Sequence, residues 1–381
     1  MNFNLSEEHL MIRDAARDFA QTELLPGVIE RDTNQTFPHE QIKKLGELGF
    51  MGMMVDPNYG GSGLDTLSYV LAMEELSKID ASASVVVSVN NSLVCWGLDT
   101  FGSEEQKAKY LPKLAAGENI GAFCLSEPEA GSDATSQSTT AVDMGDHYLL
   151  NGTKNWITNG GTCEIALVIA QTDREKGHRG INVLIVEKGM EGFVVGEKED
   201  KLGIRGSDTH TLLFNDVKVP KENRIGEDGF GFKFAMKTLS GGRIGIAAQA
   251  LGIAQGALDL ALAYSKERKT FGKPIHDHQV IAFKLADMEM KVEQARMLVY
   301  KAAWLKDQGM PYDKESAMAK LAASEAAMWV TTEAVQVHGG YGYVKEYHVE
   351  RLMRDAKITQ IYEGTSEIQR IVISRDLIKN S

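Results

Sequence analysis

The pattern of apolar residues changes twice along this 381-residue chain, and the order of the changes limits the folds open to it. Up to about residue 120 apolar residues recur at helical spacing, as at Met11, Ala15 and Phe19. From Gly121 to about residue 230, short β-like runs follow one another without helices between them. Long helical runs return from Gly231. The chain is therefore expected to be helical, then β, then helical.

The middle segment is expected to form antiparallel strands. Its β-like runs cover residues 165–172, 181–187, 193–196 and 211–219. Short strands at this spacing favour a sandwich or barrel over a parallel sheet. The pair Asn151-Gly152 predicts a tight hairpin turn, because both residues tolerate the positive φ that such a turn needs.

The C-terminal segment is expected to form a four-helix bundle. Its helical runs cover residues 232–268, 279–308, 314–337 and 366–378. Ser366 and Gln369 predict a capping box at the start of the last helix. The fold class is therefore α+β and mainly α. We expect an N-terminal helical domain at 1–120, a central antiparallel β domain at 121–230 and a C-terminal four-helix bundle domain at 231–381.

Charge and cysteine content exclude several functional classes. The 41 Lys and Arg residues against 53 Asp and Glu give a net charge of −12, which argues against a nucleic-acid binder but not against one small anionic ligand. The three cysteines, Cys95, Cys124 and Cys163, form no C-x-x-C pair, so neither a zinc site nor a disulfide framework is expected. No apolar run reaches the roughly 18 residues of a membrane span. The N-terminus begins with an acidic helix start and not with a signal peptide, so we expect a cytoplasmic protein without membrane contact.

The usual phosphate-binding motifs are missing. The glycine-rich stretches 60–63 and 226–231 do not link a strand to a helix in a βαβ unit, so both are expected to be turns. No Walker-type motif and no H-E-x-x-H motif occurs. A nucleotide, if one binds, has to be held in some other way.

Two polar stretches near the start of the β segment are candidate ligand contacts. Residues 123–133 present hydroxyl groups and backbone amides within a Pro- and Gly-bracketed turn, although a plain connector fits the same pattern. Trp156 and Thr158 alternate along a strand, which would place them on one face where they could hold a planar heterocycle. The alternative for Trp156 is packing between sheet and helices.

Glu363 is the candidate general base. Ile361, Tyr362 and Gly364 flank it, and desolvation would raise its pKa toward the value that abstraction of a weakly acidic C–H proton requires. The alternative is a solvent-facing Glu close to a helix N-terminus. Arg243 and Arg268 could clamp phosphates, or they could snorkel or cap a helix.

Several motifs in one order resemble the acyl-CoA dehydrogenase family, in its short-chain (butyryl-CoA) branch. The resemblance covers essentially the whole chain. The motifs are Leu125-Ser126-Glu127-Pro128 with Ala130-Gly131-Ser132-Asp133, Trp156-Ile157-Thr158-Asn159-Gly160-Gly161, Gly242-Arg243-Ile244-Gly245, Arg268 with Thr270-Phe271-Gly272, Arg354-Asp355-Ala356 and Ile361-Tyr362-Glu363-Gly364-Thr365.

The resemblance implies an FAD-dependent enzyme that converts a short-chain acyl-CoA to a trans-2-enoyl-CoA. Glu363 would remove the pro-R α-proton and the β-hydride would go to flavin N5. The amide of Glu363 and a flavin ribityl hydroxyl would polarise the thioester carbonyl. Electrons would pass to electron-transfer flavoprotein, and the protein would be a homotetramer built as a dimer of dimers. A branched short-chain acyl-CoA dehydrogenase, an acyl-CoA oxidase, a reductase on the same fold and a non-enzymatic helical interaction protein remain the alternatives.

The resemblance also implies binding roles for individual residues. Around the flavin ring it places Phe123, Leu125, Ser126, Trp156 and Thr158. The residues that it places against the FAD of a neighbouring subunit are the following: Arg268, Phe271, Gln279, Gln336, Gly339 and Gly340. Thr365 and Glu367 match the loop at the adenine half of FAD. The implied substrate contacts are Ser132, which is also counted with the cofactor site, and Ser240, Arg243, Tyr362 and Gly364. No metal site is implied.

Three positions refine the expected chemistry. Gly242 stands where some relatives carry their base, which leaves Glu363 as the good candidate. Ser84 stands where decarboxylating glutaryl-CoA relatives have an Arg, so a dicarboxylyl substrate is disfavoured. Ser240 stands where short-chain members commonly have Asp, which puts one CoA contact in doubt.

Overall fold

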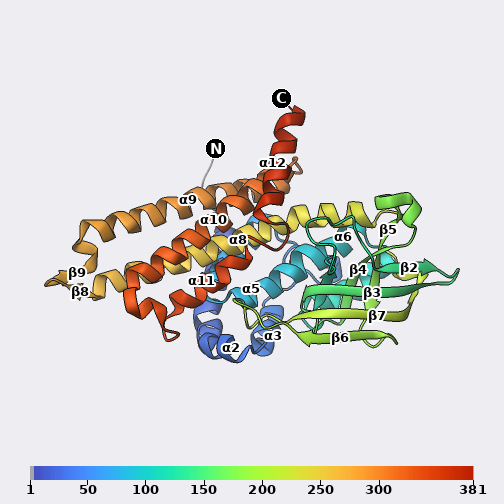
Figure 1. The fold of residues 1–381 in the computed structure, drawn as a ribbon, viewed down its shortest axis with the longest axis horizontal. Coiled ribbons are helices and arrows are strands. Elements are labelled where there is room, and N and C mark those ends of the chain that lie inside the picture. The colour runs from blue at the N-terminus through green and yellow to red at the C-terminus, as the bar shows by residue number, and fades with distance from the viewer. Residues whose placement is uncertain (1–3, 381) are drawn as a thin grey trace.

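The computed structural model describes residues 4–380 and places a helical half beside a β half (Figure 1). The expected helical N-terminal segment is confirmed. Its helices are α1 (Glu7–Phe19), α2 (Val28–Asn34), α3 (His39–Glu47), α4 (Thr66–Ile79), α5 (Ala81–Ser88), α6 (Trp96–Phe101) and α7 (Glu104–Ala115). A π-helical stretch, Val89–Cys95, joins α5 to α6, so residues 81–101 run as one continuous helical rod.

The β half is one seven-stranded sheet. Its strands are β1 (Gly121–Cys124), β2 (Thr140–Asp143), β3 (His147–Thr158), β4 (Ile165–Gln171), β5 (Ile181–Glu187), β6 (Phe193–Lys198) and β7 (Thr209–Pro220). The order is β1-β4-β2-β3-β7-β6, and β5 pairs with β4. Most pairings are antiparallel as expected, but β1 pairs with β4 in parallel over four residues and β2 touches β4 in parallel at one position. The sheet is therefore mixed at its helix-facing end.

The predicted hairpin at Asn151-Gly152 is wrong. Both residues lie inside β3, which pairs with β7 along most of its length. A register shift between Leu150 and Gly152 absorbs the pair, and the Asn151 side chain bonds both the backbone and the carboxylate of Asp216 on β7 at 2.9 Å. An Asn-Gly pair that suits a tight turn equally suits a β-bulge.

The C-terminal segment is helical as expected, with one helix more than predicted. It contains α8 (Gly231–Glu267), α9 (Gln279–Asp307), α10 (Asp313–His338), α11 (His348–Ile358) and α12 (Ser366–Asn380), and the short hairpin β8 (Lys269–Thr270) and β9 (Lys273–Pro274). The predictions omitted α11, which packs on α8 and α10 and is the fourth bundle helix. The run expected to be the fourth helix is α12, which packs on α10 and then projects from the body (Figure 1).

The two halves of the molecule meet at β4. Ile165, Leu167 and Ile169 on one face of this strand join the large core of the helices, while the residues between them join a second core inside the β half. Two helical rods, 81–101 and α8, are long and apolar enough to cross a membrane, but most of each is buried inside the protein. Burial of this kind is typical of core helices.

Candidate active site

Glu363 lies in the turn between α11 and α12. Its φ is +50°, and Gly364 follows with φ +92°. A left-handed conformation at a residue with a side chain costs of the order of 1–3 kcal/mol, so surrounding contacts have to hold it. Gln369 Nε2 donates to the carbonyl oxygens of Glu363 (3.3 Å) and Gly364 (2.8 Å), and Lys320 Nζ donates to the latter at 2.7 Å. The turn is thus fixed by side chains from two helices.

The predicted capping box at Ser366 and Gln369 is wrong. The hydroxyl of Thr365 accepts a hydrogen bond from the backbone N–H of Ile368 at 3.4 Å, so Thr365 caps α12. Ser366 Oγ is buried and has no hydrogen-bond partner in the part of the chain that the structure describes. The side-chain amide of Gln369 instead donates to the carbonyl oxygens of Glu363 and Gly364 in the turn.

One oxygen of the Glu363 carboxyl group, Oε2, is buried against α8. A Cβ added to Gly242 would lie 2.2 Å from Glu363 Oε2 and 2.7 Å from Leu93 Cδ2. Among the described residues, this buried Oε2 has no hydrogen-bond partner. Burial raises the pKa of Glu363 to about 7, although Lys320 and then Arg243 act to lower it. An unpaired carboxylate with such a pKa is suited to take a proton near neutral pH.

Arg243 and Ser240 lie on the same stretch of α8 as Gly242. Both are buried, and Arg243 Nη1 lies 3.5 Å from Ser240 Oγ. Arg243 Nε is buried without a partner among residues 4–380, and burial lowers the pKa of this guanidinium. The hydroxyl of Ser240 donates to the carbonyl of Met236 at 3.1 Å. The guanidinium thus keeps hydrogen-bonding capacity for a ligand beside the base.

The stretch 123–133 is fastened to β3 by a buried ion pair. Lys154 and Glu127 are both 0% exposed, and Lys154 Nζ donates to Glu127 Oε1 at 2.6 Å and to the carbonyl of Leu125 at 3.1 Å. The carbonyl of Ser126 accepts from the amide of Asn155 at 2.9 Å. This brings Ser126 to the strand position just before Trp156.

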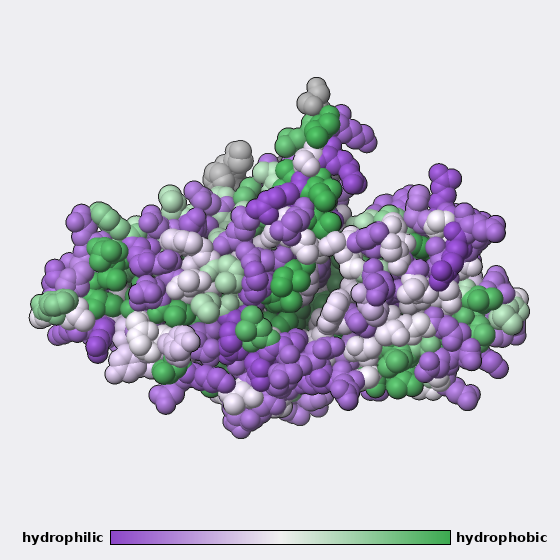
Figure 2. Space-filling view, in the orientation of Figure 1, coloured by the Kyte–Doolittle hydropathy of each residue, from purple (hydrophilic) through white to green (hydrophobic). Residues whose placement is uncertain are grey.

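Trp156 lies at a β-bulge, but exposure still alternates from exposed Trp156 through buried Ile157 to half-buried Thr158, which is consistent with the predicted shared face. The φ of Trp156 is +56°, and the register of β3 against β7 shifts between Lys154 and Ile157. The side chain of Trp156 is 59% exposed, so it is not packed between sheet and helices. Phe123, half-buried at the end of β1, stacks on Phe234 of α8 at 6.4 Å. On the face shown in Figure 2, apolar residues line a hollow between the helical and β halves, beneath α12.

A second group of predicted residues lies elsewhere, at the far end of α8. Arg268 lines an open pocket of about 690 Å³ together with Gly339 and Gly340, and Tyr264 stacks on His338 there at 4.2 Å. A Cβ added to either glycine would touch nothing within 4 Å. Nearby, Phe271 at the tip of the β8–β9 hairpin is 96% exposed. The other predicted residues are exposed at Gln279, Gln336, Glu367 and Ser132 and half-buried at Thr365.

The structure therefore divides the predicted residues into three groups, of which the first lies on β1, the stretch after it and β3: Phe123, Leu125, Ser126, Trp156 and Thr158. Glu363, Tyr362 and Gly364 lie beside Arg243 and Ser240, whereas the residues around Arg268 form a separate pocket. Sequence reasoning missed three residues that contact this group, namely Lys320, Gln369 and Gln249. The side-chain oxygen Oε1 of Gln249 accepts a hydrogen bond from the Tyr362 hydroxyl. A signal for Lys320 existed, because it is a charged residue in the otherwise apolar run Ala317–Ala323 of α10.

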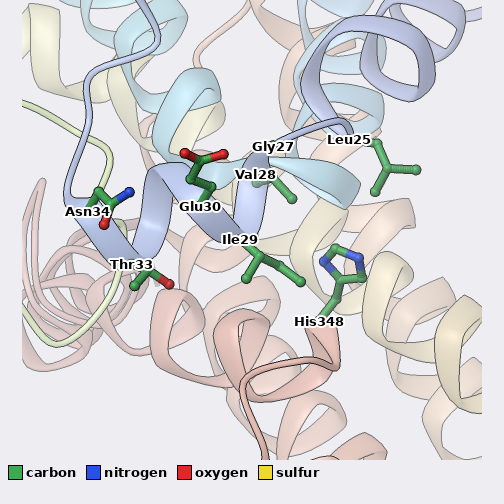
Figure 3. Close-up of a pocket in the computed structure, with 8 residues that line it drawn as sticks. All are labelled: Leu25, Gly27, Val28, Ile29, Glu30, Thr33, Asn34 and His348. Atoms are coloured by element: carbon green, nitrogen blue, oxygen red, sulfur yellow. The ribbon is translucent and has the colours of Figure 1, made fainter.

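A further open pocket, of about 550 Å³, lies between α2 and the start of α11 (Figure 3). Gly27, Val28, Ile29 and Glu30 line it, and the ring of His348 lies at its edge. Burial lowers the pKa of His348 to about 4. The pocket contains none of the predicted site residues.

Comparison with known proteins agrees with the motifs. Models of the N-terminal, middle and C-terminal domains of acyl-CoA dehydrogenase match residues 6–118, 122–217 and 229–378. The short-chain specific acyl-CoA dehydrogenase of Clostridium acetobutylicum is 53% identical over 379 residues, with 100% of both chains covered. The short-chain specific enzyme of Megasphaera elsdenii is 52% identical over 383 residues, again with 100% of both covered.

Solved structures give the same result. Butyryl-CoA dehydrogenase from Megasphaera elsdenii superposes with a TM-score of 0.98 at 52% identity, covering 99% of this chain and 100% of that chain. A chain in a structure of the electron transferring flavoprotein of Acidaminococcus fermentans superposes with a TM-score of 0.98 at 54% identity, covering 100% of both chains. The resemblance seen in the motifs is thus confirmed over the full length, and the chain belongs to the acyl-CoA dehydrogenase family.

Proposed function

We propose that this protein oxidises short-chain acyl-CoA thioesters to trans-2-enoyl-CoA, with Glu363 as the base that removes the α-proton. The observation that carries the proposal is the buried, unpartnered Oε2 of Glu363 against the bare face of Gly242, beside Arg243. Glu363 Oε2 takes the α-proton as the C–H bond breaks, and its burial keeps water from competing for the same oxygen. The two electrons leave with the β-hydride.

The turn also offers a donor to the thioester oxygen. Among the described residues the backbone N–H of Glu363 makes no hydrogen bond within the protein. An N–H held rigid by the anchored turn can stabilise the negative charge that develops on the thioester oxygen as the α-proton leaves. Arg243 and Ser240 would bind the CoA part of the substrate, with Tyr362 and Gly364 as contacts beside the base and Ser132 as a further contact.

FAD fits the residues that are present, and when bound it supplies the acceptor for the β-hydride. Phe123, Leu125, Ser126, Trp156 and Thr158 would hold the flavin ring, where the side-chain oxygen of Asn155 is buried without a partner among residues 4–380. The pocket around Arg268 offers a cation, stacked rings and two open glycines for a nucleotide half. Phe271, Gln279 and Gln336 of the same chain would join this pocket in contacting the FAD of a neighbouring subunit, with Thr365 and Glu367 at the adenine half.

The space beyond Gly242 supports a short acyl chain. A Cβ on Gly245, one turn further along α8, would lie 2.3 Å from the Tyr69 hydroxyl and 2.7 Å from Ser88 Oγ. Two turns from Gly242, Gln249 Nε2 donates to the carbonyl of Ala81 at 2.9 Å and to Ser84 Oγ at 3.2 Å. Hydrogen-bonded side chains thus fill this direction. Ser84 is itself buried in the network and brings no cation for a distal carboxylate.

The wider assignments follow from the family. We propose a cytoplasmic homotetramer, built as a dimer of dimers, that passes its electrons to electron-transfer flavoprotein. The relative from Acidaminococcus fermentans, found in an electron transferring flavoprotein structure, supports this acceptor. We also propose domain limits at 120/121 and 230/231, where α7 has ended and α8 begins.

The test is anaerobic titration of the FAD-loaded protein with C4, branched C4–C5 and C8 acyl-CoAs while flavin bleaching is followed. We expect the straight C4 thioester to bleach fastest. Glu363→Gln should slow bleaching by C4 by at least about 100-fold, because general-base catalysis contributes about 10²–10⁴-fold. Equal bleaching by the variant and the wild type would refute the assigned base, and faster bleaching by branched substrates would replace the assigned substrate.

A further inference from the structure

Lys320 is a lysine of α10 with no exposed surface. Its Nζ donates to the carbonyl of Gly364 at 2.7 Å, and it forms no ion pair with a carboxylate of the described residues. A buried cation is unfavourable unless its charge is used, and an apolar side chain of similar length would fill the same volume without that cost. The position of Lys320 therefore calls for a role for the charge.

The charged groups around Lys320 point to the base. Burial lowers the pKa of Lys320 to about 8, and Glu363 is the largest charge that opposes this, followed in size of effect by Arg243 from α8 and Glu367 from α12. Glu363 in turn is faced by Lys320 and Arg243, and the hydroxyls of Tyr69 on α4 and Tyr362 on the same turn lie near it. In the proposed function Arg243 is engaged by the CoA part of the substrate. Lys320 is tied to the backbone of the turn by its hydrogen bond to the Gly364 carbonyl, so it is not taken up by the proposed CoA site.

We propose that Lys320 is a positioning residue for the dehydrogenation, which clamps the turn that carries Glu363 and supplies a positive charge that keeps the carboxylate ionised before proton transfer. This inference rests on the proposed role of Glu363 as the base. The carbonyl of Gly364 accepts from both Lys320 and Gln369, which uses both of its lone pairs. Lys320 thus acts on the base twice, once through the backbone and once through its charge.

The sign of the electrostatic effect follows from the surroundings. Burial raises the pKa of Glu363 to about 7, and Lys320 is the largest influence that opposes this rise. Removing the lysine charge raises the pKa of Glu363 further, so that less of the base is ionised at neutral pH. The bleaching rate, which depends on the ionised base, then needs a higher pH to reach its plateau.

The experiment compares Lys320→Met, Lys320→Gln and Lys320→Arg in the FAD-loaded enzyme. The rate of flavin bleaching by butyryl-CoA is measured anaerobically from acid to alkaline pH. In the Met and Gln variants we expect the rise of the bleaching rate on the acid side of the pH profile, the acid limb, to move to higher pH by about one unit. The reason is that an opposite charge close by shifts a carboxyl pKa by about 1–3 units. Lys320→Arg should keep the limb of the wild type. Gln369→Leu removes a hydrogen bond to the same carbonyl without changing the charge, so it should slow bleaching and leave the limb in place.

A second readout does not depend on turnover. The protonated carboxyl band of Glu363 is titrated by infrared difference spectroscopy, with Glu363→Gln as the assignment control. Lys320→Gln should shift this titration upward as it shifts the bleaching profile. An unchanged titration in a folded, charge-free variant overturns the proposal. If butyryl-CoA fails to bleach even the wild type, the proposed function fails, while the infrared titration still decides whether Lys320 acts on Glu363. Should Lys320→Met not fold, the Gln and Arg variants provide the same comparison.

Discussion

At the scale of single residues, the missing side chain of Gly242 sets where the proposed base, Glu363, can lie. Glu363 Oε2 occupies the space that a Cβ at this position would need. The same glycine excludes a base on α8, so Gly242 and Glu363 are two parts of one arrangement. The strained φ of Glu363 aims the carboxyl group into this space, and the anchors of the turn oppose the strain.

Gly242→Ala should therefore disable the enzyme without unfolding it. The added methyl group displaces Glu363 Oε2, and a displacement of about 1 Å can cost about 100-fold in rate. We expect flavin bleaching by butyryl-CoA to slow by about that factor, with FAD absorbance retained. The matched control is Gly241→Ala, where the new Cβ meets only the flexible end of Lys306 at 3.6 Å. If both variants bleach like the wild type, the contact between Gly242 and Glu363 is not required for catalysis.

At the scale of elements, the sequence predicted regular periodicity well and local backbone chemistry poorly. Long helices such as α8 and α10 are extended Ala-rich runs, and both lie within a residue or two of their predicted bounds. The short helix α11 was missed because it is rich in charges, although Val349, Leu352 and Ala356 form a buried stripe. The hairpin failed because the choice between a turn and a bulge depends on the partner strand β7. Contacts across the chain, such as that of Lys320 with Gly364, leave no periodic trace.

The loop that carries Leu125 and Ser126 depends on one buried ion pair, which is an element-scale property. Burial lowers the pKa of Lys154 to about 8 while Glu127 opposes this, and the pKa of Glu127 falls to about 2 with Lys154 nearby. Lys154→Met leaves the Glu127 carboxylate buried without its cation, which costs about 3–5 kcal/mol. We expect urea unfolding to show this loss.

The double variant Lys154→Met with Glu127→Leu is the control for that prediction. An apolar pair of similar volume carries no unpaired charge, so the double variant should be more stable than Lys154→Met alone. FAD affinity should fall in the single variant as well, because the loop loses its fastening to β3. Additive losses in the double variant would contradict a coupled pair.

At the scale of the whole molecule, the group around Glu363 and the pocket around Arg268 lie far apart in one chain. Arg268 lies about 39 Å along α8 from Gly242, since a helix rises about 1.5 Å per residue. A single dinucleotide beside Glu363 cannot also reach the pocket around Arg268 in the same chain. The proposed role of Arg268 in FAD binding therefore calls for a second copy, which brings its Arg268 pocket to the flavin beside the first as in the proposed homotetramer. Phe271, fully exposed at the tip of its hairpin, is suited to the same contact.

This arrangement predicts complementation between two damaged chains. The Arg268→Ala chain keeps Glu363 for its own site but lacks the arginine that would contact the FAD of a neighbouring chain. The Glu363→Gln chain lacks the base but keeps that arginine. Co-expression of the two should restore bleaching by butyryl-CoA at about a quarter of the wild-type sites, because random pairing joins an intact base to an intact partner arginine with that frequency. The matched control co-expresses Glu363→Gln with Gly242→Ala. Gly242 and Glu363 serve the same site within one chain, so no mixed pair is whole and activity should stay near zero. No recovery in the test pair would contradict the shared arrangement, whereas recovery in the control would contradict the placement of Gly242 and Glu363 in one chain's own site.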